Sequence, residues 1–527
     1  MENRQETEGN KTTEVSANDK AAELPPELFI GLVGGVGTDF DVLVSNLTNA
    51  LNSVGYDTLE IRLSSLIRDL PKYSTLPTRP LDEHIKSHMK AGDEFRAECE
   101  RNDAVALLGV GKIKDLRESQ EKVSQGQAYL IRSLKNPEEV KTLRTIYGDS
   151  FYLVAAYSPI SERRMFLTKG IAQTRNKYPA SEHEEVANNL IKTDQEELGA
   201  EHGQQSRDSI HRADAFVDMR DAQALERSVK RFIELLFGNT FHTPTKEEYG
   251  MFLAHAAALR SAELGRQVGA AITDREGEVL AVGCNEVPKA GGGLYWSYDK
   301  PDKREFHNKS DTSDEQKRNL ISETLSFLRG AGWLKEEFAK QDDEMLLSLA
   351  TGPDHPALPK DAKIRNVIEY GRAVHGEMAA LTNAARKGVA VAGCTMFVTT
   401  FPCHLCARHI VSAGIAKVIY VEPYTKSLTE ELYLDSISVD SECRDETRIP
   451  FEPFVGVAPR QYQNLFTAGI RKSKDGKTIK FSREVAKLRY HEIPNVYTEA
   501  EVIEFKALTK IMRAKGIIKQ TEDSKHG

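Results

Sequence analysis

Two short motifs constrain the fold of this chain most: His375-Gly-Glu377 and Pro402-Cys403-His-Leu-Cys406. One imidazole and two thiolates are ligands that zinc accepts, and together they fill three of its four tetrahedral positions. We therefore predict one zinc ion held by His375, Cys403 and Cys406, with the fourth position open as in catalytic sites. Glu377 is left over as a carboxylate beside the metal, which is the place of a general acid and base.

The spacing of these residues also predicts their local structure. Cys403 and Cys406 follow a proline suited to a helix start, so they share one face of a first turn where the helix dipole favours thiolates. His375 opens an apolar run at 378–386 that is typical of a helix, and 394–400 is typical of a strand. The metal ligands are thus expected at the starts of two helices that flank one strand end.

A redox pair or a structural zinc ribbon are the other uses of Cys-x-x-Cys. A structural zinc ribbon needs two such pairs, and the six cysteines contain no second Cys-x-x-Cys, so the sequence argues against a ribbon. The order of the motifs, with the helix and strand between them, favours catalytic zinc. His404 and His409 are expected to be ordinary helix residues, because a fourth protein ligand would close the catalytic position.

Together the motifs resemble the signature of zinc-dependent cytosine and adenine deaminases. Upstream, a helix around 254–263 precedes two strands at 267–272 and 278–282, and the segments Arg266-Gln-Val-Gly-Ala and Gly283-Cys-Asn285-Glu-Val-Pro288 resemble the opening of deoxycytidylate deaminases. The resemblance implies a cytidine-deaminase-like α/β/α sandwich in which Glu377 moves protons. It also implies that Asn285 contacts the deoxyribose and Arg266 the phosphate.

The pattern of the N-terminal part predicts a second α/β domain. A strand at 28–33 leads into a glycine-rich turn and a helix at 42–54, and further strands are expected at 58–61, 104–108, 151–156 and 215–217. Strands that alternate with helices in this way predict a doubly wound parallel sheet. The turn contains Gly34, Gly35, Gly37 and Thr38.

This strand, loop and helix resemble those of small P-loop kinases, with one departure. Asp39, Phe40 and Asp41 stand where the motif needs Gly, Lys and Ser or Thr, so phosphoryl transfer is disfavoured. A tight structural turn and residual nucleotide sensing both stay open for this degenerate phosphate loop. The pair Arg163-Arg164 could line a phosphate site or lie on a solvated helix face.

The layout as a whole resembles bacterial anti-phage deoxycytidine nucleotide deaminases, in which a degenerate P-loop kinase-like domain precedes the deaminase domain. That resemblance implies conversion of dCTP or dCMP to deoxyuridine nucleotides, and nucleotide depletion during infection. The alternatives are a housekeeping dCMP deaminase that supplies dUMP, a polynucleotide cytosine deaminase, and an effector gated by a nucleotide. A homo-oligomer and a nucleotide effector or inhibitor are expected partners.

Length and composition set the domain limits. With 527 residues, 40% apolar and 28% charged, the chain suits two or three globular domains. We expect a disordered tail at 1–26, the kinase-like domain at 27–237, the deaminase domain at 238–470 with an insertion at 297–365, and an extension at 471–527. The insertion is predicted to be a small helical subdomain that acts as a lid or an oligomer contact.

Charge and hydropathy limit the partners. The net charge of -8 argues against a partner with a long phosphate backbone, so no extended nucleic-acid binding is expected. No apolar run is long enough to cross a bilayer, none resembles a signal region, and cysteines are few. These features predict a cytoplasmic protein with no membrane partner.

Overall fold

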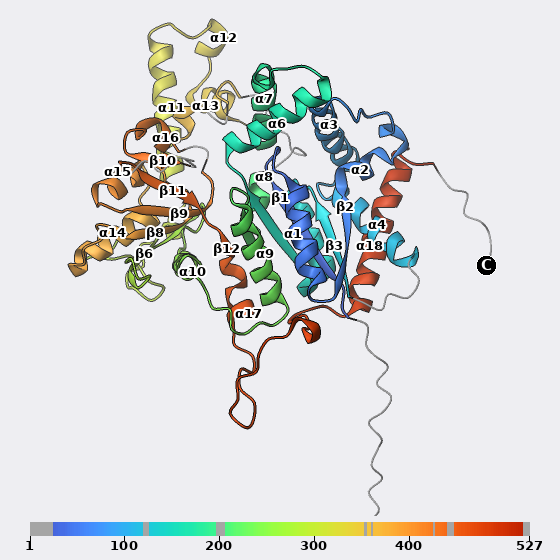
Figure 1. The fold of residues 1–527 in the computed structure, drawn as a ribbon. Helices are drawn as coiled ribbons and strands as arrows, with labels where there is room; N and C mark the ends of the chain where they lie inside the picture. Colours follow the sequence, from blue (N-terminus) through green and yellow to red (C-terminus); the bar gives the residue numbers. More distant parts are fainter. Residues whose placement is uncertain are drawn as a thin grey trace, which may run out of the picture.

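The chain folds into two lobes, each built around a six-stranded sheet (Figure 1). This computed structural model describes residues 25–119, 126–196, 206–352, 356–359, 362–424, 427–439 and 447–519. The tail predicted at 1–26 therefore lies, up to residue 24, outside the described residues. In the described part, no helix is long and apolar enough to cross a membrane.

The first sheet has the order β12-β5-β4-β1-β3-β2. Its first five strands in the sequence pair in parallel, and only β12 (Gly456–Val457), which comes from the far end of the chain, pairs antiparallel to β5. The parallel strands are β1 (Leu28–Gly34), β2 (Tyr56–Arg62), β3 (Gly126–Arg132), β4 (Phe151–Tyr157) and β5 (Ala215–Asp218).

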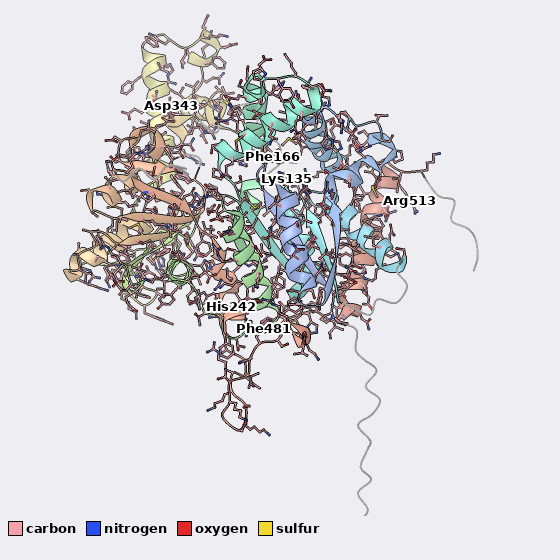
Figure 2. All side chains as sticks on the ribbon, viewed as in Figure 1. Lys135, Phe166, His242, Asp343, Phe481 and Arg513 are labelled. Atoms are coloured by element: carbon pink, nitrogen blue, oxygen red, sulfur yellow. The ribbon has the colours of Figure 1, made fainter. Side chains whose placement is uncertain are left out.

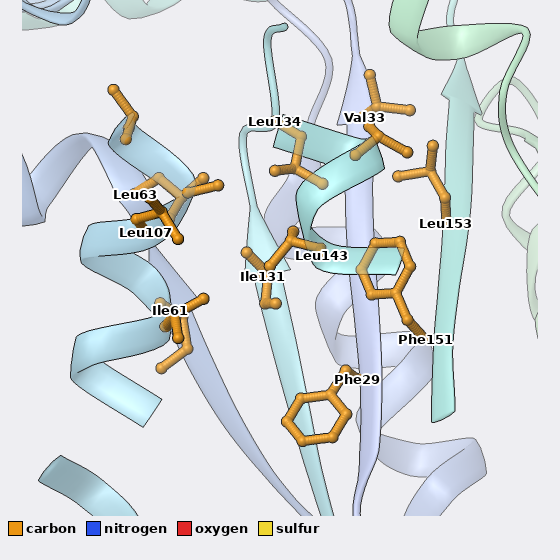
Figure 3. Close-up of a cluster of buried hydrophobic side chains, with 14 of the residues drawn as sticks. Phe29, Val33, Ile61, Leu63, Leu107, Ile131, Leu134, Leu143, Phe151 and Leu153 are labelled. Carbon is orange, nitrogen blue, oxygen red and sulfur yellow. The ribbon is translucent and has the colours of Figure 1, made fainter. Parts of the chain in front are cut away.

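Helices cover both faces of this sheet, which confirms the predicted doubly wound arrangement. Alternate residues of β1 enter different cores: Leu28, Ile30 and Leu32 pack with α1 and α9, whereas Phe29 and Val33 pack with α2 to α5 (Figure 3). The helices are α1 (Phe40–Asn52), α2 (Leu63–Arg68), α3 (Leu81–Cys99), α4 (Ala104–Ser119), α5 (Pro137–Tyr147), α6 (Ile160–Arg175), α7 (Glu184–Glu196), α8 (Ser206–Ile210) and α9 (Ala222–Leu236).

One predicted strand is wrong. Residues 104–108 begin α4, and the central strand β3 lies further on, at Gly126–Arg132. A short apolar run fits a buried strand and a buried helix equally well. Here the apolar positions continue to Val110 and Ile113 at helical spacing, and both side chains are fully buried.

The second sheet has the order β10-β11-β9-β8-β6-β7. β6 is antiparallel to β7 and β8, whereas β8, β9, β11 and β10 run in parallel. The strands are β6 (Gly269–Thr273), β7 (Val279–Cys284), β8 (Thr395–Thr400), β9 (Lys417–Glu422), β10 (Ile437–Val439) and β11 (Ile449–Pro453).

Helices lie on both faces of this sheet too. Met251 and Ala254 of α10 (Lys246–Ala258) pack on one face, and α14 (Gly376–Lys387) and α15 (His404–Ser412) share the core of the other. Two shorter helices follow, α16 (Thr429–Leu432) and α17 (Tyr462–Phe466). The predicted succession of helix, hairpin, helix, strand, helix and strand is confirmed, and so is the sandwich.

The insertion between β7 and α14 forms the predicted helical subdomain. It contains α11 (Thr312–Gly330), α12 (Glu336–Ala339) and α13 (Asp343–Thr351), with α11 packed against α13. In Figure 1 these helices rise above the second sheet. A role as a lid or an oligomer contact stays a prediction.

The C-terminal extension returns to the first lobe. Its helix α18 (Pro494–Ala514) packs against α4, and Tyr497, Leu508 and Met512 are buried in the core of that lobe (Figure 1). Arg117 of α4 forms ion pairs with Glu501 of α18 at 2.6 Å and with Glu27 at 2.8 Å. Residues near the two ends of the chain thus complete one core.

Truncation of Leu508 tests that packing. Because its side chain is fully buried, Leu508→Ala should destabilise the first lobe by about 2–5 kcal/mol. Ile503→Ala on the same helix is the control, since Ile503 is exposed, and should change stability by about 0.5 kcal/mol or less. Denaturant unfolding followed by circular dichroism measures both. Equal effects would contradict the described packing of α18.

Candidate metal and catalytic site

The three predicted metal ligands converge on one point. His375 is the N-cap of α14, Cys403 is the N-cap of α15, and Cys406 lies in the first turn of α15. His375 Nδ1 is 3.3 Å from Cys403 Sγ and 3.4 Å from Cys406 Sγ, and all three ligand atoms lie within 4.8 Å of one another. One nitrogen and two sulfurs at this spacing suit tetrahedral zinc, so the geometry fits the predicted ligand set.

The electrostatics of the ligands also favour a cation. Hydrogen bonding with Cys406 and then His375 lowers the pKa of the Cys403 thiol to about 4, which makes this residue a ready thiolate. The bond to Cys403 in turn raises the pKa of His375 to about 9. A metal must displace that imidazole proton, so metal binding is expected to release protons.

Glu377 stands beside the ligands without joining them. It lies in the first turn of α14 and is only 4% exposed. Burial raises the pKa of its carboxyl to about 7. A carboxyl that titrates near neutral pH can both accept and return a proton, as general acid–base work requires.

A cavity of about 350 Å³ opens onto these residues. Its lining includes His375, Glu377 and Cys403, together with residues from the hairpin, the insertion and the ends of β8 and β9. The wall residues with polar or aromatic side chains are Glu263, Arg266, Asn285, Asp311, Ser313, Asp314, Lys317, Thr400, Phe401 and Tyr424.

Asn285 and Arg266 line this cavity, but both are engaged within the protein. The Asn285 amide accepts a hydrogen bond from Val268 N–H at 2.7 Å and donates one to the Arg266 carbonyl at 2.7 Å. The Arg266 guanidinium pairs with Glu422 at 3.0 Å and lies 5.9 Å from the Tyr424 ring. Asn285 therefore fixes the segment that carries Arg266, and Arg266 remains about half exposed at 52%.

Several residues that line the cavity were not predicted from the sequence as site residues. Tyr424 had a signal, because it follows β9 and the ends of parallel neighbours β8 and β9 meet at one edge, beside Cys403. Asp311, Asp314 and Lys317 come from the insertion, which carries no motif. Lys317 pairs with Asp314 at 3.0 Å, so the insertion brings one cation and two carboxylates to the cavity.

The glycine-rich loop is not part of this site. Gly34 ends β1, and Gly35, Gly37 and Thr38 follow it at the carboxyl end of the first sheet. Gly37 adopts φ +88°, a backbone conformation that favours glycine. Gly35 lines a second cavity, of about 440 Å³, which also touches Phe401 and Tyr424 of the metal site.

Known proteins resemble one part of the chain. Residues 244–422 match the family model of the cytidine and deoxycytidylate deaminase zinc-binding region. That match contains the hairpin, the cavity wall around Asn285 and all three metal ligands. This part of the second lobe is therefore similar to the zinc-binding region of cytidine and deoxycytidylate deaminases, in line with the resemblance of the sequence motifs.

Individual relatives match different lengths of the chain. The deoxycytidylate deaminase of Enterobacteria phage T2 is 44% identical over 54 residues, which are 10% of this chain and 29% of that protein. The human deoxycytidylate deaminase is 25% identical over 176 residues, 33% of this chain and 63% of that protein. The dCMP deaminase of cyanophage S-TIM5, solved with dCMP and dUMP, is 17% identical with a TM-score of 0.22, and the match covers 40% of this chain and 98% of that one.

Proposed function

We propose that this protein is a zinc-dependent hydrolase that deaminates deoxycytidine nucleotides, dCTP, dCMP or both, to deoxyuridine nucleotides and ammonia. One observation carries the proposal: His375, Cys403 and Cys406 meet around one point with the buried Glu377 beside it, next to a cavity of about 350 Å³. The match of residues 244–422 to the deaminase zinc-binding region supports it.

The reaction needs one proton carrier, and Glu377 supplies it. Zinc, when bound, would acidify a water molecule that replaces the amine at C4 of the cytosine ring. Glu377 accepts the proton of that water, passes it to N3 of the ring and then assists the departure of ammonia. Its pKa of about 7 matches this double task at neutral pH. The balance is one water consumed, and one amine exchanged for a carbonyl oxygen.

Other residues would orient the nucleotide. Phe401 and Tyr424 offer aromatic surface for the base, and Asn285 holds the segment at 266–268 against the sugar. Arg266 and Lys317 are the cations of the cavity wall, each paired with a carboxylate. A substrate phosphate would have to replace Glu422 and Asp314 as the partners of these cations. The negative charge of the substrate should therefore strongly affect its binding.

Comparing dCTP, dCMP, deoxycytidine and cytosine in single-stranded DNA tests the substrate class. We expect kcat/KM to be highest for the nucleotides, because without a phosphate the recruited cations gain no new partner. Arg266→Ala should lower kcat/KM for dCMP by about tenfold or more and change that for deoxycytidine little. Arg275→Ala, in an exposed turn of the hairpin, is the matched control. Equal values for all substrates would return the question to nucleoside or polynucleotide deamination.

We further propose that the first lobe is a P-loop kinase-like domain that does not transfer phosphoryl groups. Its parallel sheet, with a glycine-rich loop after β1, supports the kinase-like fold. Phe40 and Asp41 replace the lysine and hydroxyl that hold phosphate and magnesium. Purified protein should hydrolyse neither ATP nor GTP. Zinc-independent hydrolysis that disappears in Gly37→Ala would contradict this proposal.

For the biological role we propose anti-phage defence by nucleotide depletion, and the alternative is housekeeping supply of dUMP. The fusion of a degenerate loop domain to the deaminase domain supports the first, since housekeeping catalysis needs only the second lobe. A homo-oligomer and a nucleotide effector or inhibitor belong to the same proposal. The test measures dCTP pools and plaque counts in infected cells that carry the unchanged protein or Glu377→Ala. A lower dCTP pool and fewer plaques with the unchanged protein would support defence, and no difference between the two would favour housekeeping supply.

A further inference from the structure

The glycine-rich loop already holds an anion, and that anion belongs to the chain itself. The Val36 N–H donates a hydrogen bond of 2.8 Å to the Asp194 carboxylate, which α7 carries and which is fully buried. Glycine-rich loops after a strand bind phosphate through such amide groups. Asp194 therefore sits where a bound phosphate group would be expected.

Cations that the sequence motif lacks reach this place from other elements. Lys135, which is labelled in Figure 2, follows β3. Its Nζ lies 2.7 Å from the Asp194 carboxylate and donates to the Gly34 carbonyl at 3.3 Å. Arg163 is buried and packs against Gly35. A Cβ atom on residue 35 would lie only 2.3 Å from Arg163 Nη1. Lysine and arginine thus surround the loop although Phe40 stands at the usual lysine position.

Thr38 adds a buried polar group at the base of the same loop, although it does not line the neighbouring cavity. Its residue is only 6% exposed, and its hydroxyl has no hydrogen-bond partner in the part of the chain that the structure describes. The hydroxyl lies 3.4 Å from the position of a Cβ on Gly34, at the base of the loop. A buried hydroxyl without a partner is costly, so the loop keeps a polar group unsatisfied next to the place that Asp194 occupies.

The space next to the loop is large enough for a small organic ligand. The cavity of about 440 Å³ lies between the lobes, with Gly35, Ser158, Arg163 and Asp194 at one end. The other end is lined by aromatic side chains: Phe401, Tyr420, Tyr424 and Phe454. A phosphate-binding end and an aromatic end together suit a nucleotide, whose base has a face that stacks on aromatic rings.

We propose that this cavity is a second nucleotide site, for a nucleoside monophosphate, and that Asp194 is its internal competitor. The phosphate of the ligand takes the place of the Asp194 carboxylate at Val36 N–H and Lys135 Nζ. The base lies against the aromatic end. Affinity is then set by competition between the phosphate and Asp194, and the resident carboxylate keeps the site closed to weak ligands.

This site would communicate with the metal site through shared residues. Phe401 and Tyr424 line both cavities, so a ligand in one constrains the wall of the other. The effect on deamination rests on the proposed function, whereas ligand binding does not. A binding experiment therefore tests the second site even if the deaminase activity is not found.

Isothermal titration of the full-length protein with AMP, adenosine and inorganic phosphate is the test. AMP carries no cytosine, and the two fragments separate the contributions of base and phosphate. Asp194→Asn should bind AMP about tenfold or more tightly than the unchanged protein, because the competing charge is gone and Lys135 needs an anion. Adenosine and phosphate should each bind more weakly than AMP. Glu185→Gln, an exposed acid on the same helix, should behave like the unchanged protein.

Two further variants locate the ligand. Lys135→Gln and Gly35→Ala, each combined with Asp194→Asn, should remove the gain in AMP affinity. The double variant with Lys135→Gln also removes the lysine that Asp194→Asn would leave without its carboxylate, so it can be studied if Asp194→Asn alone folds poorly. Circular dichroism checks the fold of each variant. AMP affinity that does not rise in a folded Asp194→Asn protein, or that survives in both double variants, would overturn the proposal.

Discussion

Glu377→Ala should abolish most turnover and leave the zinc in place. Removal of a positioned general acid and base typically lowers the rate by about 10²–10⁴-fold. Glu377 is buried beside the metal ligands but is not among the groups that meet at the metal point. Zinc content should therefore stay near one ion per chain, which elemental analysis measures beside kcat for dCMP.

Two controls sharpen this experiment. Glu377→Gln keeps the shape of the side chain but cannot carry the proton, so it should be nearly as inactive as Glu377→Ala. Glu276→Gln changes an exposed acid in the hairpin turn and should be fully active. A Glu377 variant that retained substantial activity, or that came out folded but free of zinc, would show that its assigned role is wrong.

The geometry of the candidate metal site could be predicted from the sequence because much of the information for it lies in two short motifs. Local backbone geometry sets the ligands of each motif at a helix start, and the two helices, α14 and α15, then meet in one shared core. The structure brings His375, Cys403 and Cys406 together as predicted. Asn285 shows the limit of the same reasoning, since its amide is bonded to the backbone of residues 266 and 268, and no spacing rule reveals that.

Other features depend on contacts between distant segments. Residues 104–108 are as apolar as a strand, but the helix that they begin is buried by α2, α3 and α5 and also by α18, which comes from the far end of the chain. Lys135 and Asp194 likewise meet at the glycine-rich loop from separate elements. Phe40 at the usual lysine position predicted a loop without a lysine, but in the structure Lys135 lies beside the loop instead.

Loss of one thiolate should remove the metal and loosen the second lobe. Cys406 is fully buried in the core that α14 and α15 share, and its Sγ lies 3.4 Å from His375 Nδ1. Cys406→Ser should lower zinc content from one ion per chain to a small fraction, and activity with it, since structural rearrangement cannot replace the ligand. Zinc that binds only the folded state also stabilises that state, so the variant should unfold at a lower temperature.

The control is Cys394→Ser, which changes a buried thiol before β8 that is not among the metal ligands. It should retain zinc and respond to a chelator as the unchanged protein does, by a fall in Tm, whereas Cys406→Ser should no longer respond. Zinc affinity should also rise with pH, because the proton that His375 holds with a pKa of about 9 competes with the metal. Full zinc content in Cys406→Ser would mean that the ion is bound by other residues, and the role assigned to Glu377 as the proton carrier beside the metal would then be wrong.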